Sequence, residues 1–251
     1  IFTQGAIGQL QRKRVWNYME RIIPGLTGLE ILELNCGTGE DALMFSEKGF
    51  NIVATDISAE MLRVTQQKAK QYSMQHRISS RYLDLENFDE SVFDKKFDLI
   101  FSNFGGLNCI SPESLKILLE KIPSILSPGG RFIAILMPKF CLWESIYFLL
   151  KFRFQKILRR LINKEVNADL HGTEMKIWYY NPSQLKNASS SNFETITTLP
   201  IGFALPPSYL ETFFAKKKGL LGRLNKLEVT FSHVSFLSIL SDHYLIDLKL
   251  K

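Results

Sequence analysis

Apolar runs and segments of helical periodicity alternate along the first half of the chain. Short apolar runs bounded by turn residues predict buried strands at 29–34, 51–55, 78–83, 97–104 and 131–137. Helical spacing of apolar residues predicts helices at 5–23, 40–48, 59–72 and 111–126. This alternation is typical of a mostly parallel sheet with helices on both of its faces.

The second half continues the pattern but interrupts it twice. Strand-like runs recur at 175–180, 193–201 and 243–250, and a short helix begins at 181–183. The segments 138–176 and 203–240 separate them. We therefore predict one α/β domain over residues 1–251 with two insertions. Both insertions begin at the carboxyl edge of the sheet, where such folds bind ligands, so both are expected to lie over the site.

The first insertion has a distinctive pattern of its own. Apolar side chains spaced as on one helical face run from Trp143 to Leu161, with Lys151, Lys156, Arg159 and Arg160 around the other face. One interpretation is a helix packed between the sheet and the second insertion. The other is a basic amphipathic helix that touches a membrane surface or admits an apolar substrate.

The turn after the first strand is the strongest indication of chemistry. In the stretch ILELNCGTGEDA, Asn35, Gly37 and Gly39 can adopt positive φ, and the helix that follows offers its N-terminus to a ligand. Gly37-x-Gly39-x-x-Ala42 also fits a loose dinucleotide-binding pattern. Glu33 favours a cofactor with a cationic sulfonium over a dinucleotide, because its carboxylate would attract the sulfonium and repel a pyrophosphate.

The order E-x-N-x-G-x-G resembles the first motif of class I S-adenosylmethionine-dependent methyltransferases, with Asn35 in place of the first glycine. Asp56 after the second strand, Asp84 after the third and the turn SPGGR at 127–131 extend the resemblance over residues 29–137. It implies a Rossmann-like, seven-stranded sheet whose last strand is antiparallel. S-adenosyl-L-methionine would be the cofactor and S-adenosyl-L-homocysteine the product.

The resemblance also implies roles for individual residues. Asp56 would accept hydrogen bonds from the ribose hydroxyls, Asp84 would meet the adenine amino group, and the end of the fourth strand would face the methionine part. The expected cofactor-binding residues are Glu33, Asn35, Cys36, Gly37, Thr38, Gly39, Asp56, Ile57, Met61, Asp84, Leu85, Ser102, Asn103 and Phe104.

Composition and charge limit where the protein works. Three scattered cysteines without paired spacing indicate a reducing cytoplasm and no structural metal. No apolar run approaches a membrane span. The net charge of +6 lies in the insertions: eight Lys/Arg against four Asp/Glu in 138–176, and five against two in 203–240. An electrostatic partner, including the inner surface of a membrane, is therefore expected there.

These observations predict methyl transfer to oxygen or nitrogen of a small, hydrophobic or aromatic acceptor. His171 is the candidate general base, and Trp178, Tyr179, Phe148 and Phe152 are candidates for the acceptor pocket. A nucleic-acid or protein methyltransferase is the alternative, although the segment after strand four lacks the N/D-P-P-Y/F tetrapeptide of enzymes that act on base nitrogens. A non-catalytic S-adenosylmethionine-binding module is a third interpretation. Nothing in the sequence indicates the oligomeric state.

Overall fold

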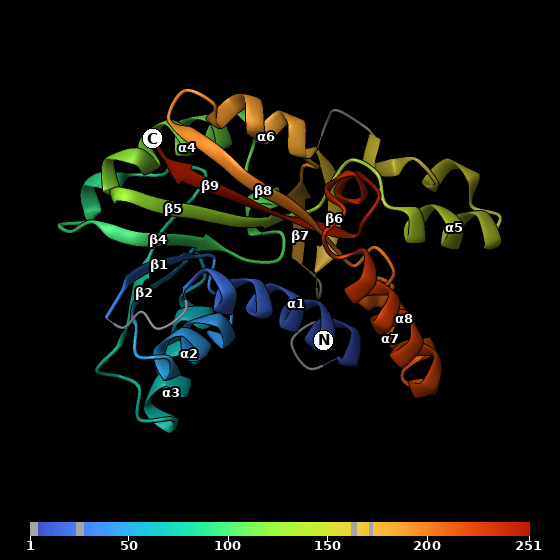
Figure 1. Ribbon diagram of the computed structural model, residues 1–251, viewed down its shortest axis with the longest axis horizontal. Coiled ribbons are helices and arrows are strands. Elements are labelled where there is room, and N and C mark those ends of the chain that lie inside the picture. Colours follow the sequence, from blue (N-terminus) through green and yellow to red (C-terminus); the bar gives the residue numbers. More distant parts are fainter. Residues whose placement is uncertain (1–4, 24–27, 162–164, 171–172) are drawn as a thin grey trace.

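A computed structural model describes residues 5–23, 28–161, 165–170 and 173–251. A seven-stranded sheet lies between two layers of helices, as Figure 1 shows. Its strands are β1 (Glu30–Leu34), β2 (Asn51–Asp56), β3 (Ile78–Tyr82), β4 (Phe97–Ser102), β5 (Leu126–Leu136), β8 (Phe193–Ile201) and β9 (His243–Leu250).

The strand order is β3-β2-β1-β4-β5-β9-β8. The first five strands pair in parallel, whereas β9 pairs antiparallel with both β5 and β8. The mostly parallel sheet with an antiparallel last strand is therefore confirmed. Because β9 runs in the opposite direction, its first residue, His243, lies at the same edge as the carboxyl ends of the parallel strands.

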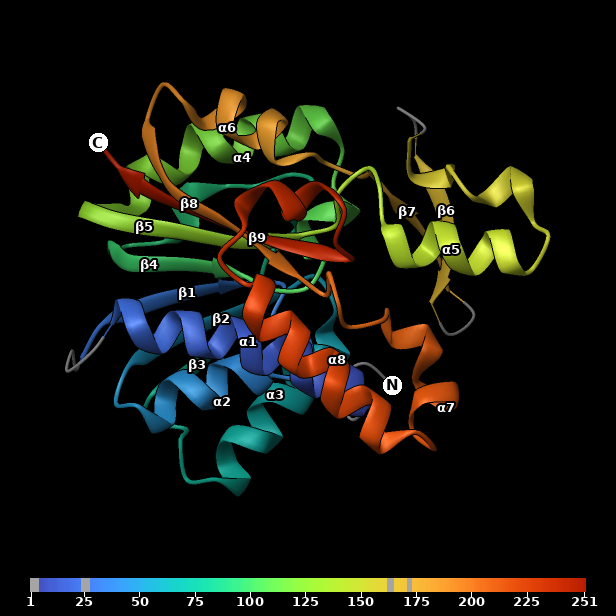
Figure 2. The same ribbon diagram turned by 45° about the vertical axis from the view of Figure 1, so that its right-hand side comes forward.

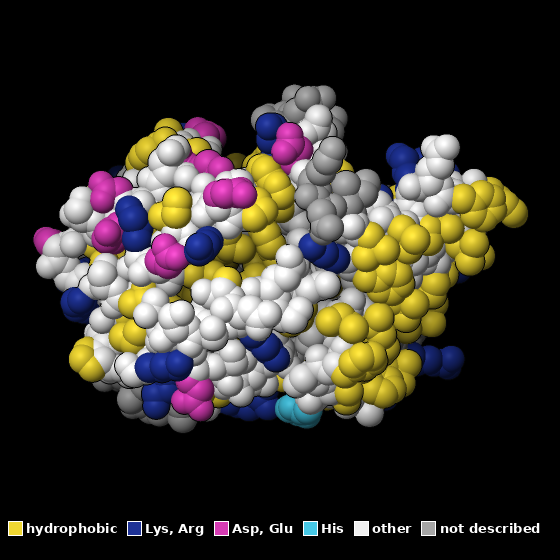
Figure 3. Space-filling view, turned by 90° about the horizontal axis from the view of Figure 1, so that it is seen from above, with side chains coloured by type: hydrophobic (Ala, Val, Ile, Leu, Met, Phe, Trp, Pro, Cys, Tyr) yellow, Lys and Arg dark blue, Asp and Glu magenta, His cyan; other side chains and the backbone are white. Residues whose placement is uncertain are grey.

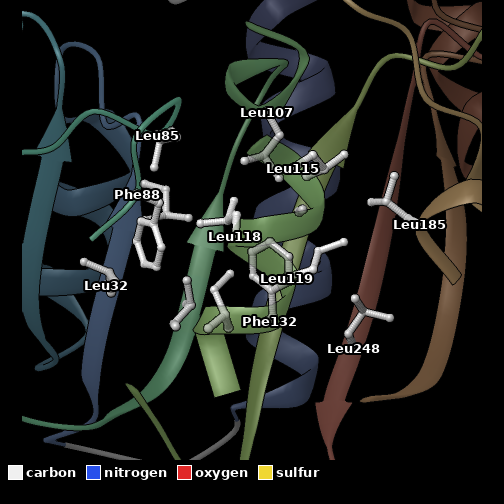
Figure 4. Packing of buried hydrophobic residues seen from close by; sticks show 14 of the residues in the cluster. Leu32, Leu85, Phe88, Leu107, Leu115, Leu118, Leu119, Phe132, Leu185 and Leu248 are labelled. Atoms are coloured by element: carbon white, nitrogen blue, oxygen red, sulfur yellow. The ribbon is translucent and has the colours of Figure 1, made fainter. Parts of the chain in front are cut away.

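Helices cover both faces of the sheet because the central strands, such as β1 and β4, are buried on both sides. On one face lie α1 (Ala6–Ile22), α2 (Glu40–Glu47) and α3 (Ala59–Gln71); on the other lie α4 (Pro112–Ile125) and α6 (Pro182–Ser189). Figure 4 shows leucines of α4 and α6 packed on Phe132 and Leu248 of the sheet. Ser58 and Ser111 cap α3 and α4 by accepting bonds from Met61 N and Ser114 N.

The first insertion does not form the continuous helix predicted over 143–161. Helix α5 (Leu142–Leu150) ends where Phe152 adopts a φ of +54°, and two 3₁₀ turns, η3 (Phe154–Lys156) and η4 (Arg159–Leu161), follow. A separate hairpin of β6 (Val166–Leu170) and β7 (Thr173–Ile177) completes the insertion. The strand-like run at 175–180 therefore contributes to this hairpin and not to the main sheet.

The second insertion consists of η5 (Ser208–Leu210), α7 (Glu211–Phe214), α8 (Lys218–Phe231) and η6 (Ser235–Ile239). It packs against the first insertion: the ring centroids of Trp143 and Phe214 are 5.9 Å apart, and those of Tyr147 and Tyr209 are 5.6 Å apart. Figure 2 shows α5 and α7 at the same end of the molecule. Two short 3₁₀ turns, η1 (Glu90–Val92) and η2 (Gly106–Cys109), flank β4.

None of the helices in the described ranges is long and apolar enough to cross a membrane. Within the same ranges, no group of three or more His, Cys, Asp or Glu side chains could hold a metal ion.

Candidate cofactor site

The turn after β1 is built on three residues with positive φ: Asn35 at +53°, Gly37 at +52° and Gly39 at +74°. The Asn35 side chain accepts a bond from Ser102 Oγ (2.6 Å) and donates to Asn103 O (3.0 Å). Asparagine therefore tolerates the backbone conformation and also joins the turn to the end of β4. A glycine could supply only the conformation.

The two glycines of the turn have different structural roles. A Cβ added at Gly37 would meet nothing within 4 Å, so this backbone is open to a ligand. A Cβ at Gly39 would lie 2.7 Å from Thr65 Cγ2 on α3. Gly39 is therefore required for the packing of α3 against the turn.

Asp56 holds this turn from the end of β2. Its Oδ2 accepts a bond from Gly37 N and its Oδ1 from Ser58 N, each at 2.9 Å. The remaining lone pairs are available to a ligand, because Asp56 also lines the adjacent cavity.

That cavity has a volume of about 710 Å³ and lies at the carboxyl edge of β1, β2 and β3. It brings together six of the predicted site residues: Asn35, Asp56, Ile57, Asp84, Leu85 and Trp178. The other lining residues are Leu83, Glu86, Gly106, Cys109, Ile110, Ser111, Met175 and Lys176. The wall is thus mostly apolar and carries a few carboxylates, as is usual for small-molecule sites.

Some of the cavity-lining residues that we did not predict carry a signal in the sequence. The loop Phe104-Gly105-Gly106 follows a strand, which marks a place of close backbone approach, and a Cβ at Gly106 would overlap the Asn35 side chain. Met175 and Lys176 reach the cavity from the first insertion, by tertiary packing that local patterns do not encode. Among the described residues of 203–240, none lines it.

Glu33 is placed differently from the prediction. Its side chain is 1% exposed and does not line the cavity. The Ala42 amide donates to the carboxyl, while Oε2 has no hydrogen-bond partner among the described residues. Burial, and next the negative charge of Asp41, raise the pKa of Glu33 well above its ordinary value. A direct contact between Glu33 and a bound sulfonium is therefore not supported.

Other predicted cofactor residues also lie outside the cavity lining. They are Cys36, Gly37, Thr38, Gly39, Met61, Ser102, Asn103 and Phe104. Burial raises the pKa of the Cys36 thiol, which lies 3.7 Å from Thr65 Oγ1. Phe104 adopts a φ of +41°, and its ring contacts the Arg12 guanidinium and the His243 ring.

The predicted acceptor residues are not brought together. Trp178 lines the cavity, but Tyr179 is buried with the Arg160 guanidinium 5.2 Å from its ring centroid. Phe148 is buried beside Arg159, and Phe152 is 81% exposed. Neither phenylalanine lines the cavity, because α5 ends at Leu150 and projects away from it. His171 lies outside the described residues.

His243 lies at the carboxyl edge of the sheet but does not line the cavity. Its Nδ1 lies 3.3 Å from Asp242 Oδ2, and its ring packs edge-on against Phe104 at the end of β4. Its side chain is buried. The reversed direction of β9, which the resemblance implied, could have placed it at this edge.

Asp41 fastens α1 beside the site. Its carboxylate accepts bonds from Arg12 Nη1 and Trp16 Nε1, each at 2.6 Å, and from Asn103 Nδ2 at 2.9 Å. Asp41 is 3% exposed, so these charge-assisted bonds are shielded from water. The sequence pattern gave no indication of this arrangement, because the partners of Asp41 lie on α1 and just after β4, far from it in the sequence.

Comparison with known proteins agrees with this geometry. Residues 31–130 match a sequence family described as a methyltransferase domain. A malonyl-[acyl-carrier protein] O-methyltransferase of Pectobacterium atrosepticum is 32% identical over 111 residues, which are 43% of this chain and 39% of that protein. The chain thus matches well under half the length of this curated relative.

Solved structures extend the likeness over almost the whole chain. An S-adenosylmethionine-dependent methyltransferase from Mesorhizobium loti superimposes with a TM-score of 0.60 at 16% identity, covering 96% of this chain and 99% of that one. The glycopeptide N-methyltransferase MtfA, complexed with S-adenosyl-L-homocysteine, gives 0.59 at 14% identity, covering 96% and 90%. At such identities the likeness shows the fold.

The fold and the glycine turn define a class I methyltransferase domain. The family match places that domain at residues 31–130 of this chain, and the resemblance found in the sequence is confirmed.

Proposed function

We propose that this chain transfers a methyl group from S-adenosyl-L-methionine to a small, hydrophobic or aromatic acceptor. The observation that carries the proposal is the cavity, which is lined by Asn35 of the β1 turn, Asp56 and Asp84 at one edge of the sheet. These are the groups that an adenosine cofactor requires in this fold. The relatives differ in their named acceptors, an acyl-carrier-bound malonyl group and a glycopeptide, so the acceptor is argued here from the cavity wall alone.

The residues present fit this cofactor. Asp56 can accept hydrogen bonds from the ribose hydroxyls. Ile57 and Leu85 offer apolar surface to the adenine base, and Asp84 can accept a hydrogen bond from its amino group. Gly37 leaves the backbone open to a ligand. Bound S-adenosylmethionine supplies an electrophilic methyl group on a sulfonium sulfur.

The protein's contribution is mainly orientation and exclusion of water. Methyl displacement requires the acceptor atom in line with the departing sulfur, and a positioned pair of reactants gains much of its acceleration from that alignment. Trp178, Met175 and Ile110 give the cavity the apolar wall that suits an aromatic or aliphatic acceptor.

Calorimetry tests the cofactor assignment. Wild-type protein should bind S-adenosylmethionine in preference to NADH, and Asp56→Ala should weaken binding by about 2–4 kcal/mol, because charge-assisted bonds to the ribose are lost. Asp89→Ala is the matched control, since Asp89 is an exposed acid that accepts a bond from Ser91 N outside the cavity. Preference for NADH, or equal effects of the two substitutions, would refute the assignment.

A further inference from the structure

The two insertions present a shared surface of apolar and basic side chains. We define the apolar–basic face by the exposed hydrophobic and the exposed basic residues of 149–158 and 209–220. They are Leu149, Leu150, Phe152, Phe154, Leu158, Tyr209, Phe213, Leu220, Lys151, Arg153, Lys156, Lys216, Lys217 and Lys218. Figure 3 shows a band of hydrophobic side chains at this end of the molecule, with Lys and Arg side chains near it.

Contacts between the insertions make this one surface. Tyr147 on α5 meets Tyr209, and Trp143 meets Phe214, whose ring is 5.0 Å from that of Phe213. Lys217 Nζ lies 4.0 Å from the Phe213 ring centroid, so the charge and the apolar surface are adjacent.

The acidic side chains around this face are turned inward. Glu144 is buried against Arg159 and Arg160. Glu211 accepts bonds from Ala6 N and Ile7 N at the start of α1, and the buried Glu228 accepts from Gly202 N and two further amides. The carboxylates of 142–161 and 209–231 are thus hydrogen-bonded within the protein, whereas the basic side chains of the apolar–basic face are exposed to solvent.

The end of α5 shows that the apolar side chains are held outward. Arg153 N donates to Phe148 O (2.9 Å) and Phe152 N to Leu149 O (3.0 Å), which closes the helix in a Schellman motif. Phe152 occupies the left-handed position, where glycine is strongly favoured. A bulky ring therefore stands 81% exposed at a strained backbone position, between Lys151 and Arg153.

We propose that the apolar–basic face docks on the surface of an anionic lipid bilayer. Phe152, Leu150 and Phe154 enter the boundary between headgroups and acyl chains, and the flanking lysines and arginines meet lipid phosphates. The exposed positive charge favours an anionic bilayer over a neutral one. Nucleic acid would require an open polar surface, whereas the aromatic rings that protrude from this face suit the apolar layer of a bilayer. Docking is independent of methyl transfer and requires no cofactor.

Phe152→Gly tests the proposal without endangering the fold, because glycine relieves the strained backbone. Vesicles of phosphatidylglycerol and phosphatidylcholine should bind the wild-type chain, more strongly at low salt, and vesicles of phosphatidylcholine alone should not. Phe152→Gly should bind about tenfold more weakly with an unchanged or raised Tm, because an exposed ring is lost from the lipid contact. Ser73→Gly is the matched control.

That control has the same backbone geometry away from the face. Ser73 has a φ of +58° at the end of α3, in a helix end closed by Met74 N to Ala69 O (2.7 Å). Ser73→Gly should raise or keep Tm, and it should bind vesicles as the wild type does. Replacing Lys216, Lys217 and Lys218 with glutamine should abolish the preference for anionic vesicles.

Three results would overturn the proposal. The first is a wild-type chain that does not bind anionic vesicles at low salt. The second is equal vesicle binding by wild-type protein and Phe152→Gly. The third is a wild-type dimer in sedimentation velocity that Phe152→Gly converts to a monomer, since a second copy would then cover the face.

Discussion

Glu33 shows how one buried residue couples the protein's charge to its stability. The carboxyl is shielded from water, hydrogen-bonded at one oxygen only, and close enough to Asp41 to feel its charge. Burial costs less when the group is neutral, so the folded chain holds a proton that the unfolded chain releases above its ordinary pKa of 4.5. Stability from this residue is thus fully present below the unfolded pKa and falls as pH rises toward the folded pKa.

Glu33→Gln should therefore raise Tm more at pH 8 than at pH 4.5, because the neutral amide has no charge to desolvate. Thermal melts at the two pH values measure this effect. A Tm change that is equal at both pH values would show that Glu33 titrates normally.

At the scale of elements, a buried ion cluster attaches the first insertion to the sheet. Arg160 is 5% exposed and bonds Glu144 Oε2 at 3.0 Å and Asp242 Oδ1 at 2.9 Å, just before β9. Burial alone would raise the pKa of Asp242, but His243 and Arg160 offset it and hold that pKa below its ordinary value. The cluster fixes η4 beside β9, and with it the direction of the preceding loop.

Arg160→Met should lower the free energy of unfolding by about 3 kcal/mol, because it leaves carboxylates buried with fewer partners. Denaturant melts measure this, and limited proteolysis within 151–161 should become faster. Arg63→Met is the control: it breaks an exposed bridge to Glu60 and should change neither readout measurably. If both variants unfolded alike, the cluster would not hold the insertion.

The same elements show what sequence could and could not predict. The strands β1 to β5 and the positions of Asp56 and Asp84 were predictable, because their signals are local: apolar runs, caps and turn residues. The helix expected over 143–161 was wrong after Leu150, since the usual marker of a Schellman end is glycine and Phe152 stands there. Arg160 looked solvent-facing because its partner Asp242 is 82 residues away.

Over the whole molecule, α1 ties three parts of the fold together. Glu211 of the second insertion caps its start, Asp41 of α2 accepts bonds from Arg12 and Trp16 in its middle, and Tyr18 bonds Asp247 of β9. Each attachment is made by a carboxylate that is buried or partly buried, so each bond is worth more than an exposed pair. The helix thereby links the cofactor side of the sheet to the apolar–basic face.

Asp41→Asn tests whether α1 depends on its central attachment. The amide keeps the size of the carboxylate but presents one donor group and loses the ion pair with Arg12, so we expect unfolding to become about 2–3 kcal/mol easier. Amide hydrogen exchange over residues 6–19 should accelerate before that of α4 and α6 on the opposite face. Glu20→Gln is the matched control, because it breaks the exposed Lys48–Glu20 bridge between α1 and the end of α2 and should leave exchange nearly unchanged. Uniform acceleration on both faces would mean instead that α1 and the rest of the sheet unfold as one cooperative unit.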